Sequence, residues 1–229
     1  VLTDPPYYGN VMYSELSEFF YVWLRTALRS VYPAFEPEST PKDEEVVEQV
    51  TRGHGAPFLH KDHDFFTNGL TRIFAEAGER LRSDGTLTFT FHHQANEAWG
   101  AVLQTALDAG FYMTSVVPVH AEMRSSLHIR DKANISYDAV IICRKQEAEP
   151  PRAEWRDIED RVFVRAEQLV RELEQRTNGN RLGPEDIYVI AIGKCMEEYS
   201  KYYWRGRSYV TKGGQPVGIE EALNGDEGR

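Results

Sequence analysis

The chain is organised around a short stretch close to its first residue, Thr3-Asp4-Pro5-Pro6-Tyr7-Tyr8. Two consecutive prolines lack backbone N–H donors and have fixed φ angles, so this stretch is not suited to the interior of a helix or of a central strand. It suits a rigid exit from a hydrophobic strand. The Asp4 carboxylate and the Pro5 carbonyl then become neighbouring hydrogen-bond acceptors, with the Tyr7 ring beside them. We expect this set to accept the two hydrogens of a planar amine whose ring system stacks on Tyr7.

This motif resembles the Asp-Pro-Pro-Tyr motif of amino methyltransferases. The longer run from Asp4 to Phe20 resembles that of the large multi-domain adenine-specific DNA methylases of bacteria and archaea, some of which carry a zinc ribbon. The resemblance implies S-adenosylmethionine-dependent methylation of the exocyclic amine of adenine in DNA, with the target base rotated out of the duplex. It implies catalytic roles for Asp4, Pro5, Pro6 and Tyr7, with Asp4 and Pro5 also contacting the cofactor. Restriction–modification is one expected setting, and phage defence or regulation are others.

The composition is that of a globular protein without a membrane segment. The chain has 229 residues, of which 41% are hydrophobic and 27% are charged, which is ordinary for a globular domain. No apolar run approaches the ~18 residues of a membrane span, so we expect no membrane partner. The two cysteines, Cys143 and Cys195, lie far apart without CxxC spacing. They indicate neither a zinc site nor a disulfide framework, and they fit a cytoplasmic location.

Two observations predict that part of the enzyme lies outside this sequence. The net charge of −10 is unfavourable for a protein that must bind DNA phosphates by itself. The glycine-containing loop that binds the cofactor in methyltransferases of this fold also has no clear counterpart. Gly53-His54-Gly55 lies in a polar loop, and the sequence around Gly193 reads as the middle of a helix. We therefore expect a missing N-terminal part of the same protein as a partner of this chain.

The order of predicted elements indicates the α/β class. It corresponds to the C-terminal half of a doubly wound, Rossmann-like methyltransferase sheet that ends in an antiparallel hairpin, followed by a small helical region. The elements expected after the motif strand are a helix that ends near Pro33, a long loop, a helix capped by Asp62, a strand at 86–91, a helix at 97–109 that Gly110 ends, and strands at 111–119 and 137–143. We expect the partial catalytic domain at 1–146, a linker at 147–156, and the helical region at 157–229.

The helix after the motif carries a broad set of apolar side chains that we expect in the core. Their spacing matches one face of a helix. They are Phe19, Phe20, Val22, Trp23, Leu24, Leu28 and Val31.

Candidate DNA-contacting residues flank the motif or follow the central strand. In open α/β sheets, ligands bind beyond the carboxyl ends of the strands, where both Asp4 and the pair His92-His93 are expected. These histidines either contact the DNA or only hydrogen-bond a loop carbonyl. No further ligands at suitable spacing accompany them, so we expect no metal site. The other candidates for contacts with DNA are Tyr8, Arg124, Arg130 and Lys132; the basic residues are alternatively a solvated surface.

Two other functions remain open from the sequence. One is a methyltransferase that acts on amines in RNA or on cytosine, because a similar quartet serves those substrates. The other is a non-catalytic interaction module, which the acidic surface and the missing cofactor loop favour.

Overall fold

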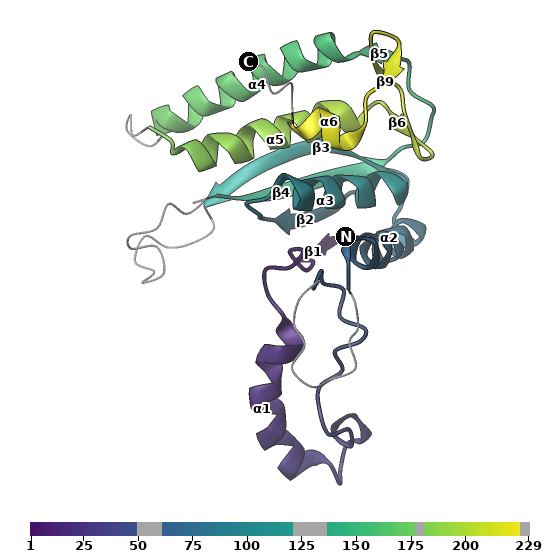
Figure 1. Ribbon diagram of the computed structural model, residues 1–229, viewed down its shortest axis with the longest axis vertical. Helices are drawn as coiled ribbons and strands as arrows, with labels where there is room; N and C mark the ends of the chain where they lie inside the picture. The colour runs from purple at the N-terminus through teal and green to yellow at the C-terminus, as the bar shows by residue number, and fades with distance from the viewer. Residues whose placement is uncertain (50–60, 121–136, 177–180, 225–229) are drawn as a thin grey trace. The chain divides into compact units, whose positions relative to one another are not determined.

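The structure is a computed structural model that describes residues 1–49, 61–120, 137–176 and 181–224 (Figure 1). Its contacts divide the chain into two units. The sheet unit comprises Val1–Pro5 and Leu70–Arg229, and the α1 unit comprises Pro6–Gly69. The expected linker at 147–156 includes strand β5 (Ala153–Glu154) and the start of helix α4 (Trp155–Arg176), both in the sheet unit; the expected domain bounds stay a prediction.

A mixed four-stranded sheet is the centre of the sheet unit. Its strands are β1 (Leu2–Thr3), β2 (Leu87–Phe91), β3 (Phe111–His120) and β4 (Tyr137–Lys145), in the order β1-β2-β4-β3. β1 is parallel to β2, whereas β4 is antiparallel to both of its neighbours. The alternation of β2 buries Leu87, Phe89 and Phe91 in the core. The α/β class and the antiparallel pairing of the last two strands are confirmed; the Rossmann-like arrangement stays a prediction.

Helices and several short strands complete the described part of the sheet unit (Figure 1). α3 (Asn96–Asp108) packs against β3, and Gly110 follows it with a φ of +84°, as expected for a helix terminator. α4 (Trp155–Arg176) packs on α5 (Pro184–Ser200), and the short α6 (Ile219–Asn224) packs on α3 and α5. α2 (His63–Arg80) contributes its residues from Leu70 onward. The short strands are β5 (Ala153–Glu154), β6 (Tyr203–Trp204), β7 (Arg207–Ser208), β8 (Val210–Lys212) and β9 (Gln215–Pro216).

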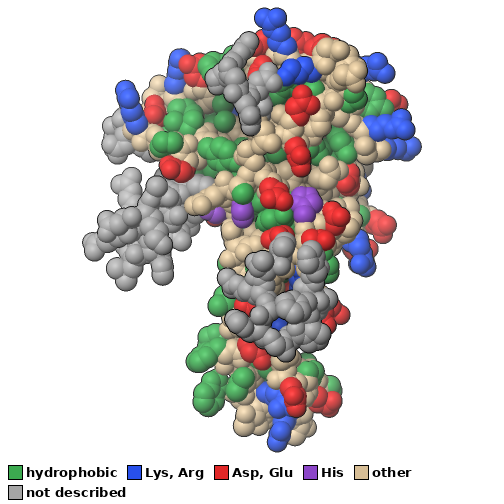
Figure 2. Space-filling model, viewed as in Figure 1, with side chains coloured by type: hydrophobic (Ala, Val, Ile, Leu, Met, Phe, Trp, Pro, Cys, Tyr) green, Lys and Arg blue, Asp and Glu red, His purple; other side chains and the backbone are tan. Residues whose placement is uncertain are grey.

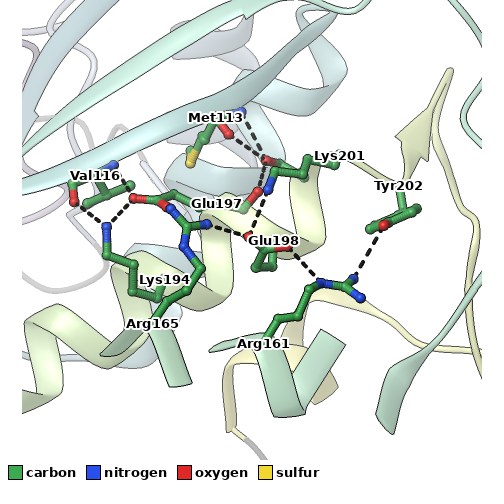
Figure 3. Close-up of polar contacts among 10 residues, drawn as sticks. Met113, Val116, Arg161, Arg165, Lys194, Glu197, Glu198, Lys201 and Tyr202 are labelled. Atoms are coloured by element: carbon green, nitrogen blue, oxygen red, sulfur yellow. Dashed lines mark hydrogen bonds and ion pairs between the residues drawn. The ribbon is translucent and has the colours of Figure 1, made fainter. Parts of the chain in front are cut away.

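Side chains of α5 form hydrogen bonds with backbone N–H and C=O groups on the outer side of β3 (Figure 3). Ser200 Oγ accepts the Met113 N–H at 2.9 Å, and the fully buried Glu197 carboxylate accepts the Val116 N–H at 2.6 Å. Lys194 Nζ donates to the Val116 carbonyl at 3.1 Å and also pairs with Glu197. Arg165 of α4 pairs with Glu197 at 2.6 Å. Because a buried carboxylate requires charged partners, this cluster fixes α4 and α5 to the edge of the sheet.

Helix α1 (Tyr13–Leu28) of the α1 unit presents its apolar side chains to solvent, which corrects the expectation that they form a core. Phe19, Phe20 and Trp23 are 68%, 64% and 70% exposed, and Figure 2 shows hydrophobic side chains projecting from this unit. Val22, Leu24 and Val31 are exposed as well, whereas Leu28 is half-buried.

The opposite, more polar face of α1 makes the contacts within the unit. The buried Tyr21 hydroxyl donates to the Pro37 carbonyl at 2.8 Å, and its ring stacks on Phe35 of the 3-10 turn η1 (Pro33–Phe35). Arg25 Nε also donates to Pro37, at 2.7 Å, and the Ser14 N–H donates to Glu45 at 3.1 Å. The periodicity correctly predicted a helix, but it could not indicate which face packs inward.

The N-terminus of α2 is capped by the residue before it. α2 begins at His63, and Asp62 Oδ1 accepts the Phe65 N–H at 2.9 Å, which confirms Asp62 as its cap. None of the helices within the described ranges is both long enough and apolar enough to cross a membrane.

Candidate functional site

The candidate site is the end of the sheet at which β1 and β2 finish and β4 begins. Asp4 follows β1, while His92 and His93 follow β2. Asp138 is the second residue of β4, whose Ala139 pairs with Phe91. The pairing of parallel strands β1 and β2 thus brings a carboxylate and two imidazoles to the same end of the sheet, as the sequence predicted for Asp4 and the histidines.

The Asp4 carboxylate is exposed and is held by a neighbour on β2. Thr3 pairs with Phe89, so the next residue, Asp4, lies beside Thr90. The Thr90 hydroxyl donates a hydrogen bond to Asp4 Oδ1. Pro5, directly after Asp4, is buried, which anchors the start of the double-proline segment. Thr90 was not predicted from the sequence. Its only signal there is the alternation of residues 86–91, which places Thr88 and Thr90 on one face of the strand.

His93 stabilises the loop between β2 and α3. Its Nδ1 accepts the Ala95 N–H at 3.0 Å, and its carbonyl accepts the indole N–H of the buried Trp99 at 2.9 Å. Burial lowers the pKa of His93. Because Nδ1 accepts a hydrogen bond, the proton of the neutral ring is on Nε2. The sequence left open that a histidine donates a hydrogen bond to a loop carbonyl. In the structure, the His93 ring instead accepts a hydrogen bond from a loop N–H.

His92 has an acidic neighbour, Asp138, that was not predicted from the sequence. Its Nδ1 lies 3.3 Å from Asp138 Oδ1, and both side chains are about one quarter exposed. A carboxylate at this distance repels a phosphate, so the geometry is less favourable for a phosphate contact by His92 than the sequence suggested.

Tyr8 is buried, which opposes its expected contact with DNA. Only 7% of it is exposed; its hydroxyl lies 3.2 Å from His63 Nδ1, and its ring meets the Phe66 ring edge-on at 5.1 Å. Its φ of +56° is unusual for a residue other than glycine. The Glu48 N–H donates to the Tyr8 carbonyl at 3.2 Å. The preceding Tyr7 is partly exposed and accepts the Asn10 N–H on its carbonyl, so a tight turn follows the motif.

The four motif residues fall on both sides of the division between the units. Asp4 and Pro5 belong to the sheet unit, whereas Pro6 and Tyr7 belong to the α1 unit. The predicted DNA contacts Arg124, Arg130 and Lys132 lie outside the described residues.

The remaining candidates for reactive groups are possible metal-ligating side chains and the two cysteines. No set of three or more histidine, cysteine, aspartate or glutamate side chains there is arranged to hold a metal ion. Both cysteines are buried; burial raises the pKa of Cys143 strongly and that of Cys195 to about 12, so both remain protonated thiols. Comparison of the chain with models of protein families, with curated proteins and with solved structures finds no match.

Proposed function

We propose that this chain carries the amine-binding half of an S-adenosylmethionine-dependent methyltransferase that acts on adenine in DNA. The observation that supports this most directly is the exposed Asp4 carboxylate, hydrogen-bonded by Thr90 at the end of a parallel strand and followed at once by two prolines. The likeness of residues 4–20 to adenine-specific methylases supplies the choice of substrate.

In the proposed reaction the chain's own residues prepare the amine. The lone pair of the adenine amine is delocalised into the ring, so the amine is a poor nucleophile. Asp4 and the Pro5 carbonyl accept its two hydrogens, which localises the lone pair on nitrogen, and stacking on Tyr7 offsets part of the cost of extracting the base. A bound sulfonium cofactor would supply the methyl group. Asp4 would take up the proton that the methylated nitrogen loses and pass it to water.

The described residues do not fit the cofactor half of such a site. Residues 92–95, which follow β2 at the site, contain no glycine that could bring the backbone close to a bound cofactor. The roles of Asp4 and Pro5 in contacting the cofactor therefore remain predictions. We infer that the main cofactor pocket is supplied by further sequence of the same protein, the expected N-terminal partner.

Substitution of Asp4 in the protein at its full natural length tests the proposal. Asp4→Asn keeps the size of the side chain and removes its charge, so we expect at least a 100-fold loss of methyl transfer to DNA. Calorimetric binding of S-adenosylmethionine should stay within about threefold. The matched control is Asp84→Asn, an exposed aspartate of the same unit. Undiminished turnover by Asp4→Asn would overturn the proposal.

Mass spectrometry of the product separates the neighbouring possibilities. Methylated adenine in DNA supports the proposal, whereas a methylated cytosine or an RNA product shows that the same acceptors serve another amine. The exposed apolar face of α1 favours the second class of function, an interaction module. S-adenosylmethionine is titrated into residues 1–229 and into the full-length protein. If the protein is only an interaction module, neither of the two binds the cofactor.

A further inference from the structure

We infer that Thr90 is a positioning residue that orients the Asp4 carboxylate for the reaction; this inference rests on the proposed function. The Thr90 hydroxyl donates to Oδ1 of Asp4. The second oxygen, Oδ2, is then the one directed to the target amine. Thr90 itself does not touch the substrate and acts only through Asp4.

The strand pairing explains why Thr90 is suited to this role. β2 is an inner strand, paired with β1 on one side and with β4 on the other, where Thr90 lies opposite Val140. Its backbone is therefore fixed by β4, and that of the preceding residue, Phe89, by β4 and β1 together. Threonine is branched at Cβ, which restricts rotation about χ1. The hydroxyl is thus presented to Asp4 from a rigid support.

The chemistry explains why Asp4 needs such a neighbour. An ionised carboxylate is an acceptor on both oxygens, and rotation about its last bond exchanges the two. An exposed aspartate at a strand end has little packing to stop that rotation. A hydrogen bond to one oxygen selects one orientation, so the other oxygen and the Pro5 carbonyl keep the separation that two amine hydrogens require. Misplacement of such a group by about 1 Å can cost on the order of 100-fold in rate.

The kinetic test compares two substitutions of Thr90 with a control on the same strand. Thr90→Val keeps the shape and removes the hydroxyl, whereas Thr90→Ser keeps the hydroxyl. For Thr90→Val in the full-length protein we expect kcat to fall about 10- to 100-fold while KM for DNA and for S-adenosylmethionine stays within twofold. Thr90→Ser should restore kcat to within about threefold. Thr88→Val, two residues earlier on the same face, should leave kcat unchanged.

A spectroscopic test examines the orientation of Asp4 without any turnover. In the wild-type protein, the three-bond Hα–Hβ couplings of Asp4 should report a single χ1 rotamer, because the hydrogen bond from Thr90 to the carboxylate restrains χ1 as well as rotation about the last bond. Thr90→Val should shift the couplings towards rotamer averages, and Thr90→Ser should keep them at the wild-type values. A general loss of structure would instead change the couplings throughout β1 and β2.

The outcomes distinguish failure of this inference from failure of the proposed function. A wild-type protein that methylates adenine, together with a Thr90→Val variant of unchanged kcat, overturns only the role of Thr90. Unchanged Asp4 couplings in Thr90→Val overturn it as well. A wild-type protein that binds the cofactor but transfers no methyl group to any DNA overturns the proposed function and the inference with it.

Discussion

Glu18, on the polar side of α1, is a carboxylate whose pKa the fold lowers strongly. It accepts hydrogen bonds from Lys42 Nζ at 2.8 Å and from the Thr40 backbone N–H at 2.9 Å. The hydrogen bonds from Lys42 and then from Thr40 lower the pKa of Glu18 from 4.5 to about 2. Because the folded pKa is depressed, the pair contributes stability above pH 4.5 and loses it as the pH falls towards 2. The side chain is partly exposed, so the gain is small.

A carboxyl-detected NMR titration checks this prediction. The pKa of Glu18 should lie near 2 in the wild-type protein and should rise towards 4.5 in Lys42→Met. Lys42→Arg, which keeps a positive donor, is the matched control and should retain most of the depression. A wild-type Glu18 that titrates near 4.5 would show that the ion pair does not persist in solution.

At the scale of single residues, the sequence reveals a site only where local chemistry is distinctive. The position of Asp4 at the end of a strand could be predicted because two prolines restrict what the adjacent backbone can do. Thr90 could not, since its partner lies 86 residues away and a threonine in a strand is ordinary. Burial of Tyr8 depends on a positive φ and on His63, which lies 55 residues further along the chain. Contacts of this kind arise from tertiary structure and leave no local pattern.

At the scale of elements, periodicity predicted the main helices and strands but not the orientation of α1. A helix with apolar residues on one side and polar residues on the other packs by its apolar side in most globular proteins. In the α1 unit, carbonyls of residues 36 and 37 and the side chains of Thr40 and Glu45 instead bind the polar side of α1. Such a partner is a loop without regular structure, and no periodic pattern identifies it.

Alanine substitutions on the two faces of α1 test this orientation. Tyr21→Ala removes a stacked, buried ring and a hydrogen bond, so we expect a loss of about 2–4 kcal/mol in local stability. Phe20→Ala, on the exposed face, should change it by less than about 0.5 kcal/mol. Hydrogen exchange of the α1 amides gives both values. An equal or larger loss in Phe20→Ala would mean that this face is covered in solution.

At the scale of the whole sheet unit, the approach of α5 to β3 depends on a glycine. A Cβ on Gly193 would lie 2.8 Å from Val116 Cγ1, and a valine side chain cannot move away. Gly193→Ala should therefore destabilise the protein by about 1–2 kcal/mol, although alanine is the better helix former. Gly100→Ala in α3 is the matched control. Its Cβ would have only van der Waals neighbours at 3.8 Å, so we expect a gain of about 0.5–1 kcal/mol.

Thermal unfolding measures this pair of glycine variants. For a unit of this size, 1 kcal/mol corresponds to roughly 2–4 °C in Tm. Gly193→Ala should melt below the wild-type protein and Gly100→Ala above it. The same sign of shift in both variants would contradict the close approach of α5 to the sheet.

The contacts of α5 with β3 also determine how the sheet can meet other chains. A ten-residue strand rich in valine at the edge of a sheet is a natural template for fibril-like stacking, because its outer N–H and C=O groups attract further strands. Here Glu197, Lys194 and Ser200 already occupy the polar groups of Met113 and Val116. A second molecule that offered a strand to β3 would have to displace a helix and a buried pair of charges. The longest edge of the sheet is therefore protected against aggregation.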